Sequence, residues 1–281
     1  MNREDILNAI VKYVKECPMN YITAEQALIP EDVGMRMYDD PIIAIGSADD
    51  PMWEGLKDRK AVGPLFRTPK EWLPGARTVI SYFAPFSEAV RTGNEKDRVE
   101  VGNGWLYARV DGQNFLNSLN HHLEDVLSVE GHKAFSPYSS AQFMDVREAG
   151  TNPNVEDPLL SFTSNWSERH VAYICGLGTF GLSKGLITKK GVSGRYGSII
   201  TDWELPADVR PYTGLYDYCT MCGACARNCP GNAITKEEGK KHSPCQTYVS
   251  DMGKKYAPRF GCGKCQVNVP CERGIPNPKF R

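Results

Sequence analysis

The sequence predicts a mixed α/β (α+β) protein of two unequal parts, a front part over residues 1–212 and a tail over residues 213–281. Three observations predict this division. Helix-like and strand-like apolar patterns follow one another through the front part. Eight of the ten cysteines lie in the last 63 residues. The charge also changes there: residues 219–281 hold 11 Lys and Arg against 4 Asp and Glu, a formal +7, which leaves −8 for residues 1–218.

Composition narrows the class of protein. With 281 residues, 41% hydrophobic and 24% charged, the chain can build a packed core and shows no bias towards disorder. A net charge of −1 gives no reason to expect a nucleic acid as the main partner. No apolar run approaches the ~18 residues that span a bilayer, and residues 2–16 indicate an amphipathic helix rather than a secretory leader. We therefore expect a cytoplasmic protein with no membrane contact, in which clustered, reduced cysteines bind metal.

Apolar spacing and turn residues locate the elements of the front part. In the first helix, Ile6, Ile10, Val11 and Val14 share one face. The predicted elements, in order, are a helix over 2–16, loops and short elements over 28–68, a buried strand over 78–83, a helix over 105–129, a short strand over 135–138, a long loop over 148–167, a helix over 167–181, two strands over 186–188 and 196–201 joined by a turn, and a linker over 206–213.

The tail opens with a cysteine run of diagnostic spacing. Cys219, Cys222, Cys225 and Cys229 follow the pattern Cys-x2-Cys-x2-Cys-x3-Cys-Pro of bacterial ferredoxins. In that arrangement three thiolates hold one [4Fe–4S] cluster and the fourth ligates a second cluster. Zinc is the weaker alternative, because four cysteines at these spacings rarely serve another purpose. The tail is therefore expected to be a ferredoxin-like iron–sulfur domain.

The other four cysteines of the tail complete a second ligand set. Exchange of the fourth ligand between two clusters predicts the following assignment. One cluster takes Cys219, Cys222, Cys225 and Cys271, and the other takes Cys229, Cys245, Cys262 and Cys265. The five-residue gap before Cys271 departs from the usual three and leaves its assignment open. Eight thiolates for two clusters leave none over. The basic residues of the tail either offset the negative clusters or form a solvated face.

Three segments of the chain together resemble a known family. They are residues 73–81 (LPGARTVIS), the pair Glu168-Arg169 followed by residues 175–181 (CGLGTFG), and residues 261–266 (GCGKCQ). In order and approximate spacing, over residues 70–275, they resemble the epoxyqueuosine reductase family, to which the respiratory reductive dehalogenases are related. The resemblance implies a nitroreductase-like domain over residues 1–212 that holds cobalamin and substrate. A ferredoxin-like double [4Fe–4S] domain over residues 213–281 would supply the electrons.

The resemblance also shows a departure. In epoxyqueuosine reductases an aspartate six residues before the glutamate of the Glu-Arg pair is thought to deliver a proton, and Phe162 stands at that position here. A phenyl ring cannot donate a proton, which predicts a different substrate and makes tRNA an unexpected partner. Glu156 and Asp157 lie on the same predicted loop and offer carboxylates in its place.

The resemblance implies three catalytic candidates. Arg169 matches the arginine of the Glu-Arg pair, Tyr138 has the chemistry of the tyrosine near the cobalt in reductive dehalogenases, and Asp157 is the acidic alternative. Their plainer interpretations are a surface arginine, a core aromatic residue and a solvated loop acid. Further candidates, each expected to be structural, are Tyr107, Tyr173, His170 and Cys175.

A broad, amide-fringed corrin needs glycines for close backbone approach and polar groups at its rim. Small residues gather directly before the tail, and we expect them to form this cradle, although singly each reads as an ordinary turn residue. The expected contacts are Gly176, Gly178, Gly181, Ser183, Gly197 and Ser198. The Gly-x-Gly-x-x-Gly pattern at 176–181 follows a helix-like segment, which argues against a nicotinamide-binding unit.

The sequence thus predicts an anaerobic iron–sulfur oxidoreductase that passes electrons through two [4Fe–4S] clusters to a bound cobalamin, which reduces a substrate. A flavin (FMN) on the same fold is one alternative, with Lys184 or Arg195 near its N1 atom. An electron-transfer protein that reduces another protein's corrinoid is the other. The expected partners are a low-potential donor such as ferredoxin or flavodoxin and a small-molecule substrate or a corrinoid protein.

Overall fold

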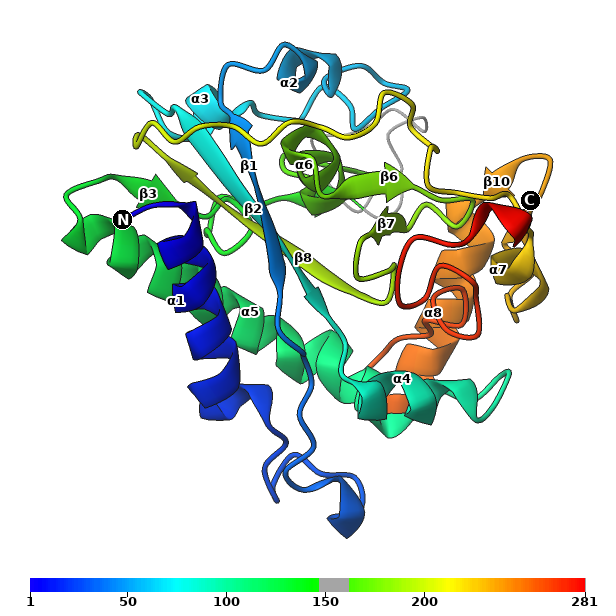
Figure 1. Ribbon diagram of the computed structural model, residues 1–281. Helices are drawn as coiled ribbons and strands as arrows, with labels where there is room; N and C mark the ends of the chain where they lie inside the picture. Colours follow the sequence, from blue (N-terminus) through cyan, green and yellow to red (C-terminus); the bar gives the residue numbers. More distant parts are fainter. Residues whose placement is uncertain (147–161, 281) are drawn as a thin grey trace.

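A four-stranded antiparallel sheet forms the centre of the computed structural model, which describes residues 1–146 and 162–280. Its strand order is β1-β2-β8-β3 (Figure 1). The strands are β1 (Ile42–Ser47), β2 (Thr78–Pro85), β8 (Gly194–Thr201) and β3 (Ala134–Phe135). Every residue of β2 is buried, as expected for an inner strand that both neighbours and both faces cover.

Helices cover both faces of this sheet (Figure 1). Ile43, Ile80 and Ile199 point towards α1 (Arg3–Glu16) and α5 (Asn103–Val129), where they share one core. Val79, Phe83 and Ile200 point the other way, towards α6 (Glu168–Cys175) and the Trp-rich segments above it. Because successive side chains of each strand point to opposite faces of the sheet, the interior is divided into two cores, one on each face.

Short elements connect and extend this body. In the front part they are η1 (Pro18–Asn20), η2 (Pro30–Asp32), α2 (Met52–Gly55), α3 (Pro69–Trp72), α4 (Glu88–Glu95), β4 (Asp145–Val146), β5 (Thr163–Ser164), β6 (Gly178–Phe180) and β7 (Leu186–Thr188). In the tail they are α7 (Ala224–Arg227), β9 (Ile234–Thr235), β10 (Gly239–Lys240), α8 (His242–Tyr256) and η4 (Pro278–Phe280).

The tail packs directly against the front part, at the end of α5 and α4. A Cβ atom at Gly263 would lie 2.0 Å from the indole ring of Trp105, so the two segments meet at the closest approach that glycine allows. Lys264 is buried, and its Nζ donates to the Asn94 carbonyl oxygen (2.7 Å) and to Asn94 Oδ1 (3.0 Å). Asn94 Nδ2 in turn donates to the Cys262 carbonyl oxygen (3.0 Å). These contacts fix the cysteines of the tail relative to α5.

The expected mixed α/β (α+β) class is confirmed, and the predicted helices over 2–16 and 105–129 and the strand over 78–83 form. Among the loops and short elements expected over 28–68 lies the six-residue strand β1, whose four inner residues are buried and which therefore carries no period-two alternation. The strands over 186–188 and 196–201 form but do not pair with each other: β7 pairs with β6, and β8 with β2 and β3. Most of the predicted loop over 148–167 lies outside the described residues. Among the described helices, none has the length and hydropathy that a membrane crossing requires.

Candidate functional site

The structure brings four cysteines together between the tail and the β6–β7 hairpin. They line a small cavity whose walls include Gly181, Ser183 and Ile187 of the front part. The chain reaches this geometry through left-handed backbone at Met221 and Gly223, just before α7. The four are Cys219, Cys222, Cys225 and Cys271, the first cysteine group.

A second cysteine group lies beside the first. Cys229 joins it from the end of the opening run, with its Sγ accepting a hydrogen bond from the Ala233 N–H at 3.2 Å. Cys245 comes from the first turn of α8. The thiols of Cys245 and Cys229 both act electrostatically on Cys265, and those of Cys265 and Cys245 act on Cys262. The members of the second cysteine group are Cys229, Cys245, Cys262 and Cys265.

The chemistry of these thiols fits metal clusters better than free cysteines. Burial, together with a smaller effect of neighbouring thiols, raises the pKa of Cys225, Cys262 and Cys271 to about 12. Such groups are costly as thiolates unless a cation compensates them. A zinc ion would need four sulfurs about 2.3 Å from one point. Within residues 1–146 and 162–280, no three His, Cys, Asp or Glu side chains converge closely enough for a single ion. The sequence pattern of the opening run is the one that holds a larger [4Fe–4S] cluster.

The two cysteine groups adjoin each other and the front part. Cys265 of the second group is the thiol with the largest electrostatic effect on Cys225 of the first. Cys265 and Cys245 also act on Arg169, the second residue of α6. The second cysteine group therefore lies near both the first group and the segment that carries the Glu-Arg pair.

Arg169 lies in a hollow of the protein. Its side chain is exposed, yet surrounding protein lowers the pKa of its guanidinium, an effect that Arg195 increases and Tyr196 and the two nearby thiols oppose. A group that is both exposed and surrounded lines a concave surface. Within the described residues, the Arg169 side chain makes no ion pair or hydrogen bond.

Glu168, next to Arg169, faces inward. Its Oε2 accepts a hydrogen bond from Ser198 Oγ at 2.8 Å, and Trp166 Nε1 donates to the same Ser198 Oγ at 2.9 Å. Oε1 is buried without a partner in the described part of the chain. Burial raises the pKa of this carboxyl to about 7, against the opposing effect of the hydrogen bond from Ser198. Glu168 is thus a carboxyl whose protonated form the fold favours.

Most of the residues expected to form the cofactor cradle contact other residues of the protein. Gly176 ends α6 in the left-handed conformation. A Cβ at Gly178 would lie 2.0 Å from the Ile187 carbonyl oxygen, and one at Gly197 would lie 2.2 Å from the Tyr82 hydroxyl. Ser198 binds Glu168. Gly181 and Ser183 line the cavity of the first cysteine group. Their expected contact with a corrin or flavin stays a prediction.

The other predicted residues are placed as follows. The Tyr138 ring packs on Phe143 with centroids 4.5 Å apart, and its hydroxyl has no partner within the described residues. Asp157 and Glu156 lie outside the described residues. Lys184 occupies a left-handed turn between β6 and β7, and Arg195 donates to Gln113 Oε1.

The four candidates expected to be structural occupy such positions. The Tyr107 hydroxyl donates to Asp32 (2.8 Å), and that of Tyr173 donates to the Thr213 carbonyl oxygen (3.4 Å). His170 Nδ1 bonds to Ser167 Oγ (2.8 Å), and burial lowers the pKa of its imidazole to about 4. Cys175 is fully buried in the core.

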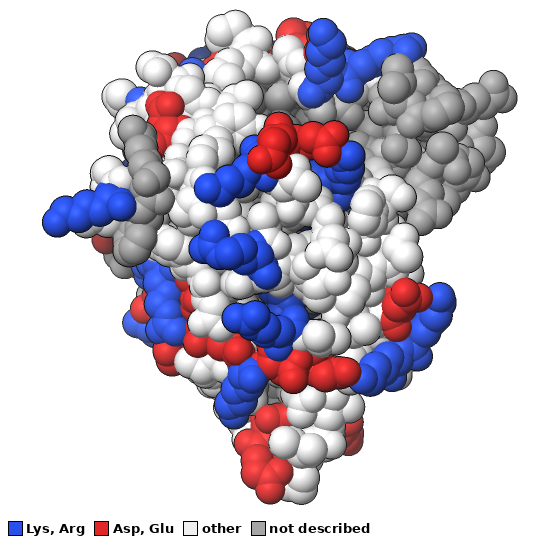
Figure 2. Space-filling view, turned by 90° about the vertical axis from the view of Figure 1, so that its right-hand side faces the viewer, with Lys and Arg blue, Asp and Glu red and all other residues white. Residues whose placement is uncertain are grey.

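Sequence reasoning missed His242, the first residue of α8. Its imidazole stacks on Phe162, with ring centroids 4.4 Å apart and an angle of 21°. Burial, and to a smaller extent Lys184, Lys240 and Arg169, lower the pKa of this imidazole to about 4. No local signal pointed to His242, because α8 brings it to Phe162 from 80 positions further along the chain. Figure 2 shows several Lys and Arg side chains in the middle of the face that includes β10 and the C-terminal segment.

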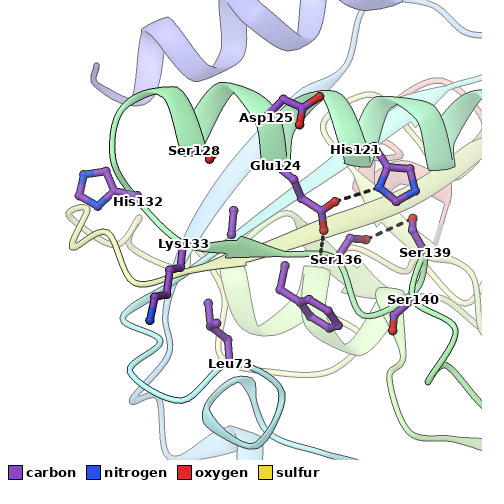
Figure 3. Close-up of a pocket in the computed structure, with 12 residues that line it drawn as sticks. Leu73, His121, Glu124, Asp125, Ser128, His132, Lys133, Ser136, Ser139 and Ser140 are labelled. Atoms are coloured by element: carbon purple, nitrogen blue, oxygen red, sulfur yellow. Dashed lines mark hydrogen bonds and ion pairs between the residues drawn. The ribbon is translucent and has the colours of Figure 1, made fainter.

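A separate cavity of about 610 Å³ lies at the opposite end of the molecule, between α5 and β3 (Figures 1 and 3). Glu124 projects into it and is held by His121 Nδ1 (2.9 Å) and by the Ser136 N–H (2.6 Å). None of the residues predicted from the sequence lines this cavity, and its carboxylate already has partners.

Comparison with known proteins gives one family match and several relatives. A 4Fe-4S binding domain model matches residues 215–235. An epoxyqueuosine reductase of Aliivibrio fischeri is 28% identical over 141 residues, which are 46% of this chain and 35% of that protein. A tetrachloroethene reductive dehalogenase of Desulfitobacterium hafniense is 38% identical over 72 residues, 25% of this chain and 13% of that protein. The chain therefore matches about a third of the first relative's length and less of the second's.

Solved structures extend the likeness to the whole chain. An epoxyqueuosine reductase with an epoxyqueuosine-modified tRNA-Tyr stem loop has a TM-score of 0.53 at 17% identity, covering 99% of this chain and 71% of that one. A reductive dehalogenase described for B12-dependent dehalogenation has a TM-score of 0.52 at 16% identity, covering 85% of this chain and 31% of that one. The resemblance expected from the sequence is therefore confirmed: the chain has the fold of epoxyqueuosine reductases and reductive dehalogenases, and its tail carries a 4Fe-4S binding segment.

Proposed function

We propose that this chain is an iron–sulfur reductase that uses two [4Fe–4S] clusters to deliver electrons to a cobalamin bound in the front part. The observation that carries the proposal is the proximity of the groups: the second cysteine group lies near both the first group and the hollow around Arg169. Redox centres in series next to a ligand-accessible hollow form an electron path that ends at a site. The relatives that share the fold are reductases, and one is described for B12-dependent dehalogenation.

The eight cysteines of the two groups would hold the clusters, in the assignment that the spatial groups give. Cobalamin, when bound, supplies a strongly reducing cobalt centre for the substrate. The cradle residues Gly181 and Ser183 would lie between this site and the first cluster. The division into domains at residues 1–212 and 213–281 remains part of this proposal.

Within the front part, Arg169 would bind the substrate. Tyr138, whose hydroxyl is unpartnered in the described residues, and Asp157 are the proton-donor candidates. A ferredoxin or flavodoxin would supply electrons to the first cluster. That tRNA is not a partner stays a prediction, because a protein of the same fold is known with a tRNA stem loop.

The test is an anaerobic reconstitution followed by ultraviolet–visible and EPR spectroscopy with cob(II)alamin. We expect about eight irons per chain and a change of the cobalt signal to a base-off form. Stoichiometric FMN binding with no cobalt response would favour the flavin alternative. Cluster loading without either cofactor would indicate an electron-transfer protein, and fewer than about four irons would overturn the iron–sulfur assignment itself.

A further inference from the structure

Three basic side chains from separate elements meet around the hollow described above. Arg169 belongs to α6, Lys184 to the β6–β7 turn and His242 to α8. Lys184 and Arg169 both act electrostatically on His242. Two packing contacts fix these elements: the Phe162–His242 ring stack at 4.4 Å, and the approach of β10 to the turn before Lys184, where a Cβ at Gly239 would lie 3.5 Å from the Leu182 carbonyl oxygen.

Among the residues that the structure describes, no acidic side chain pairs with these three. Within the described residues, none of the three makes an ion pair, and neither Arg169 nor Lys184 makes a hydrogen bond. All three are exposed to solvent, but burial by the surrounding protein is the largest cause that lowers the pKa of each. Uncompensated cations in a concave site repel one another, and a bound anion relieves that repulsion.

The backbone adds to the positive potential. The first turns of α6 and α8 carry Arg169 and His242, and neither helix has a side-chain hydrogen bond at its N-cap residue, Ser167 or Lys241. The N–H groups of an uncapped first turn, together with the helix dipole, favour a negative group nearby. Two such helix ends therefore act with the three side chains.

The nearest competing explanation is that the basic residues offset the charge of the second cluster. Lys240 and Arg169 fit it, because both act on the thiol of Cys265. For Lys184, the causes that lower the pKa are burial by the surrounding protein and then Lys240. For His242, they are burial and then Lys184, Lys240 and Arg169. Lys184 and His242 thus serve the hollow rather than the cluster.

We propose that Arg169, Lys184 and His242 form an oxyanion-binding site that holds the carboxylate or phosphate of a small-molecule substrate. That the bound molecule is the substrate of a reductase rests on the proposed function. That it carries an anionic group rests on the arrangement of the three side chains. A compact oxyanion can accept from Arg169 and Lys184 together with an imidazole N–H of His242. A neutral substrate would leave two cations uncompensated in the site.

The test is calorimetric binding of inorganic phosphate and of oxalate to the anaerobic, cluster-loaded full chain without cobalamin. We expect R169Q and K184Q each to weaken binding about tenfold and H242Q about threefold, because charged hydrogen bonds are stronger than neutral ones. The matched control is K254Q: it removes the same charge near the other end of α8, where Lys254 Nζ is paired with Asp251 at 2.8 Å. Unchanged binding in K254Q with losses in the other three supports the site.

Several outcomes would overturn it. Wild-type protein that binds neither anion has no such site. If K184Q shifts the reduction potential of a cluster as K240Q is expected to, and keeps phosphate binding, the cations are counter-charges. If the variants no longer bind cobalamin but still bind phosphate, the three side chains hold the cofactor. A tRNA stem loop could also displace phosphate at a concentration far below that of the phosphate. If the same variants then fail to bind the stem loop, the anion that the site holds is a phosphate of RNA. Phosphate binding that persists in a chain unable to bind cobalamin refutes the proposed function and leaves this site standing.

Discussion

The tail and the front part of this protein record their chemistry in different ways. In the tail, the spacing of four cysteines within eleven residues, from Cys219 to Cys229, is enough to predict a cluster. In the front part, the hollow around Arg169 draws on α6, the β6–β7 turn and α8, with His242 arriving from the tail itself. A ligand set made by one tight turn is readable from sequence, whereas a site made by several elements is not.

Even in the tail, adjacency in sequence and in space differ. Cys229 ends the opening run but lies with the second cysteine group, while Cys271 joins the first group from 46 positions beyond Cys225. The left-handed residue Asn268 and the turn that follows bring Cys271 back, and the Val192 N–H donates to its carbonyl oxygen at 2.9 Å. The front part thus helps to position a ligand of the tail.

Removal of one cysteine from each group should give the largest effects. We expect Cys225→Ser and Cys271→Ser to lose the same cluster, and Cys229→Ser and Cys265→Ser to lose the other, each with about four of eight irons missing. The residual EPR spectra should therefore match within each pair and differ between pairs. Cys17→Ser, in a half-buried cysteine at the end of α1, is the control and should keep full iron. If the EPR spectrum of Cys229→Ser instead matches that of Cys225→Ser, Cys229 holds the same cluster as its neighbours in the opening run.

A change at the junction should come next in size. Gly263 has a φ of 71° and faces Trp105, where a Cβ would lie 2.0 Å from the ring. We expect Gly263→Ala to lower the free energy of unfolding by about 3 kcal/mol, from overpacking and the left-handed backbone together. Urea unfolding followed by tryptophan fluorescence measures this change.

The control for that junction is Gly75→Ala. Gly75 has a φ of 87°, but nothing lies within 4 Å of a Cβ placed there. It should cost about 1 kcal/mol from backbone strain alone. Equal losses in the two variants would mean that the approach of Trp105 to the tail contributes nothing to stability.

An effect of up to a similar size, visible only as a dependence on pH, concerns Glu168 in the front part. Burial raises the pKa of its carboxyl from 4.5 to about 7, so the folded chain binds more protons than the unfolded chain between these values. Stability should therefore fall as the pH rises from about 4.5 to 7, by up to about 3 kcal/mol from this group. Glu168→Gln keeps the shape and removes the ionisation.

Comparison of urea unfolding at pH 5 and pH 8 isolates this contribution. The wild type should lose more stability between the two pH values than Glu168→Gln, while Glu25→Gln, an exposed acid, should follow the wild type. Parallel curves for the wild type and Glu168→Gln would show that the carboxyl is ionised in the fold at both pH values.

The sequence by itself determined the parts of this protein that depend on neighbours along the chain. Helices over 2–16 and 105–129 formed because their apolar residues recur at helical spacing. The strand over 78–83 formed because a β-branched and aromatic run follows a turn. The cysteine spacing, likewise, is a local property, and a 4Fe-4S binding domain model matches residues 215–235.

Tertiary structure decided what depends on distant partners. It placed β1 beside β2 and paired β8 with β2 rather than with β7, because strand pairing is a contact between segments far apart in sequence. It turned Ser198 towards Glu168, and it set His242 against Phe162. The polarity of the hollow followed from these placements, since electrostatic interaction depends on distance in space and not on separation along the chain.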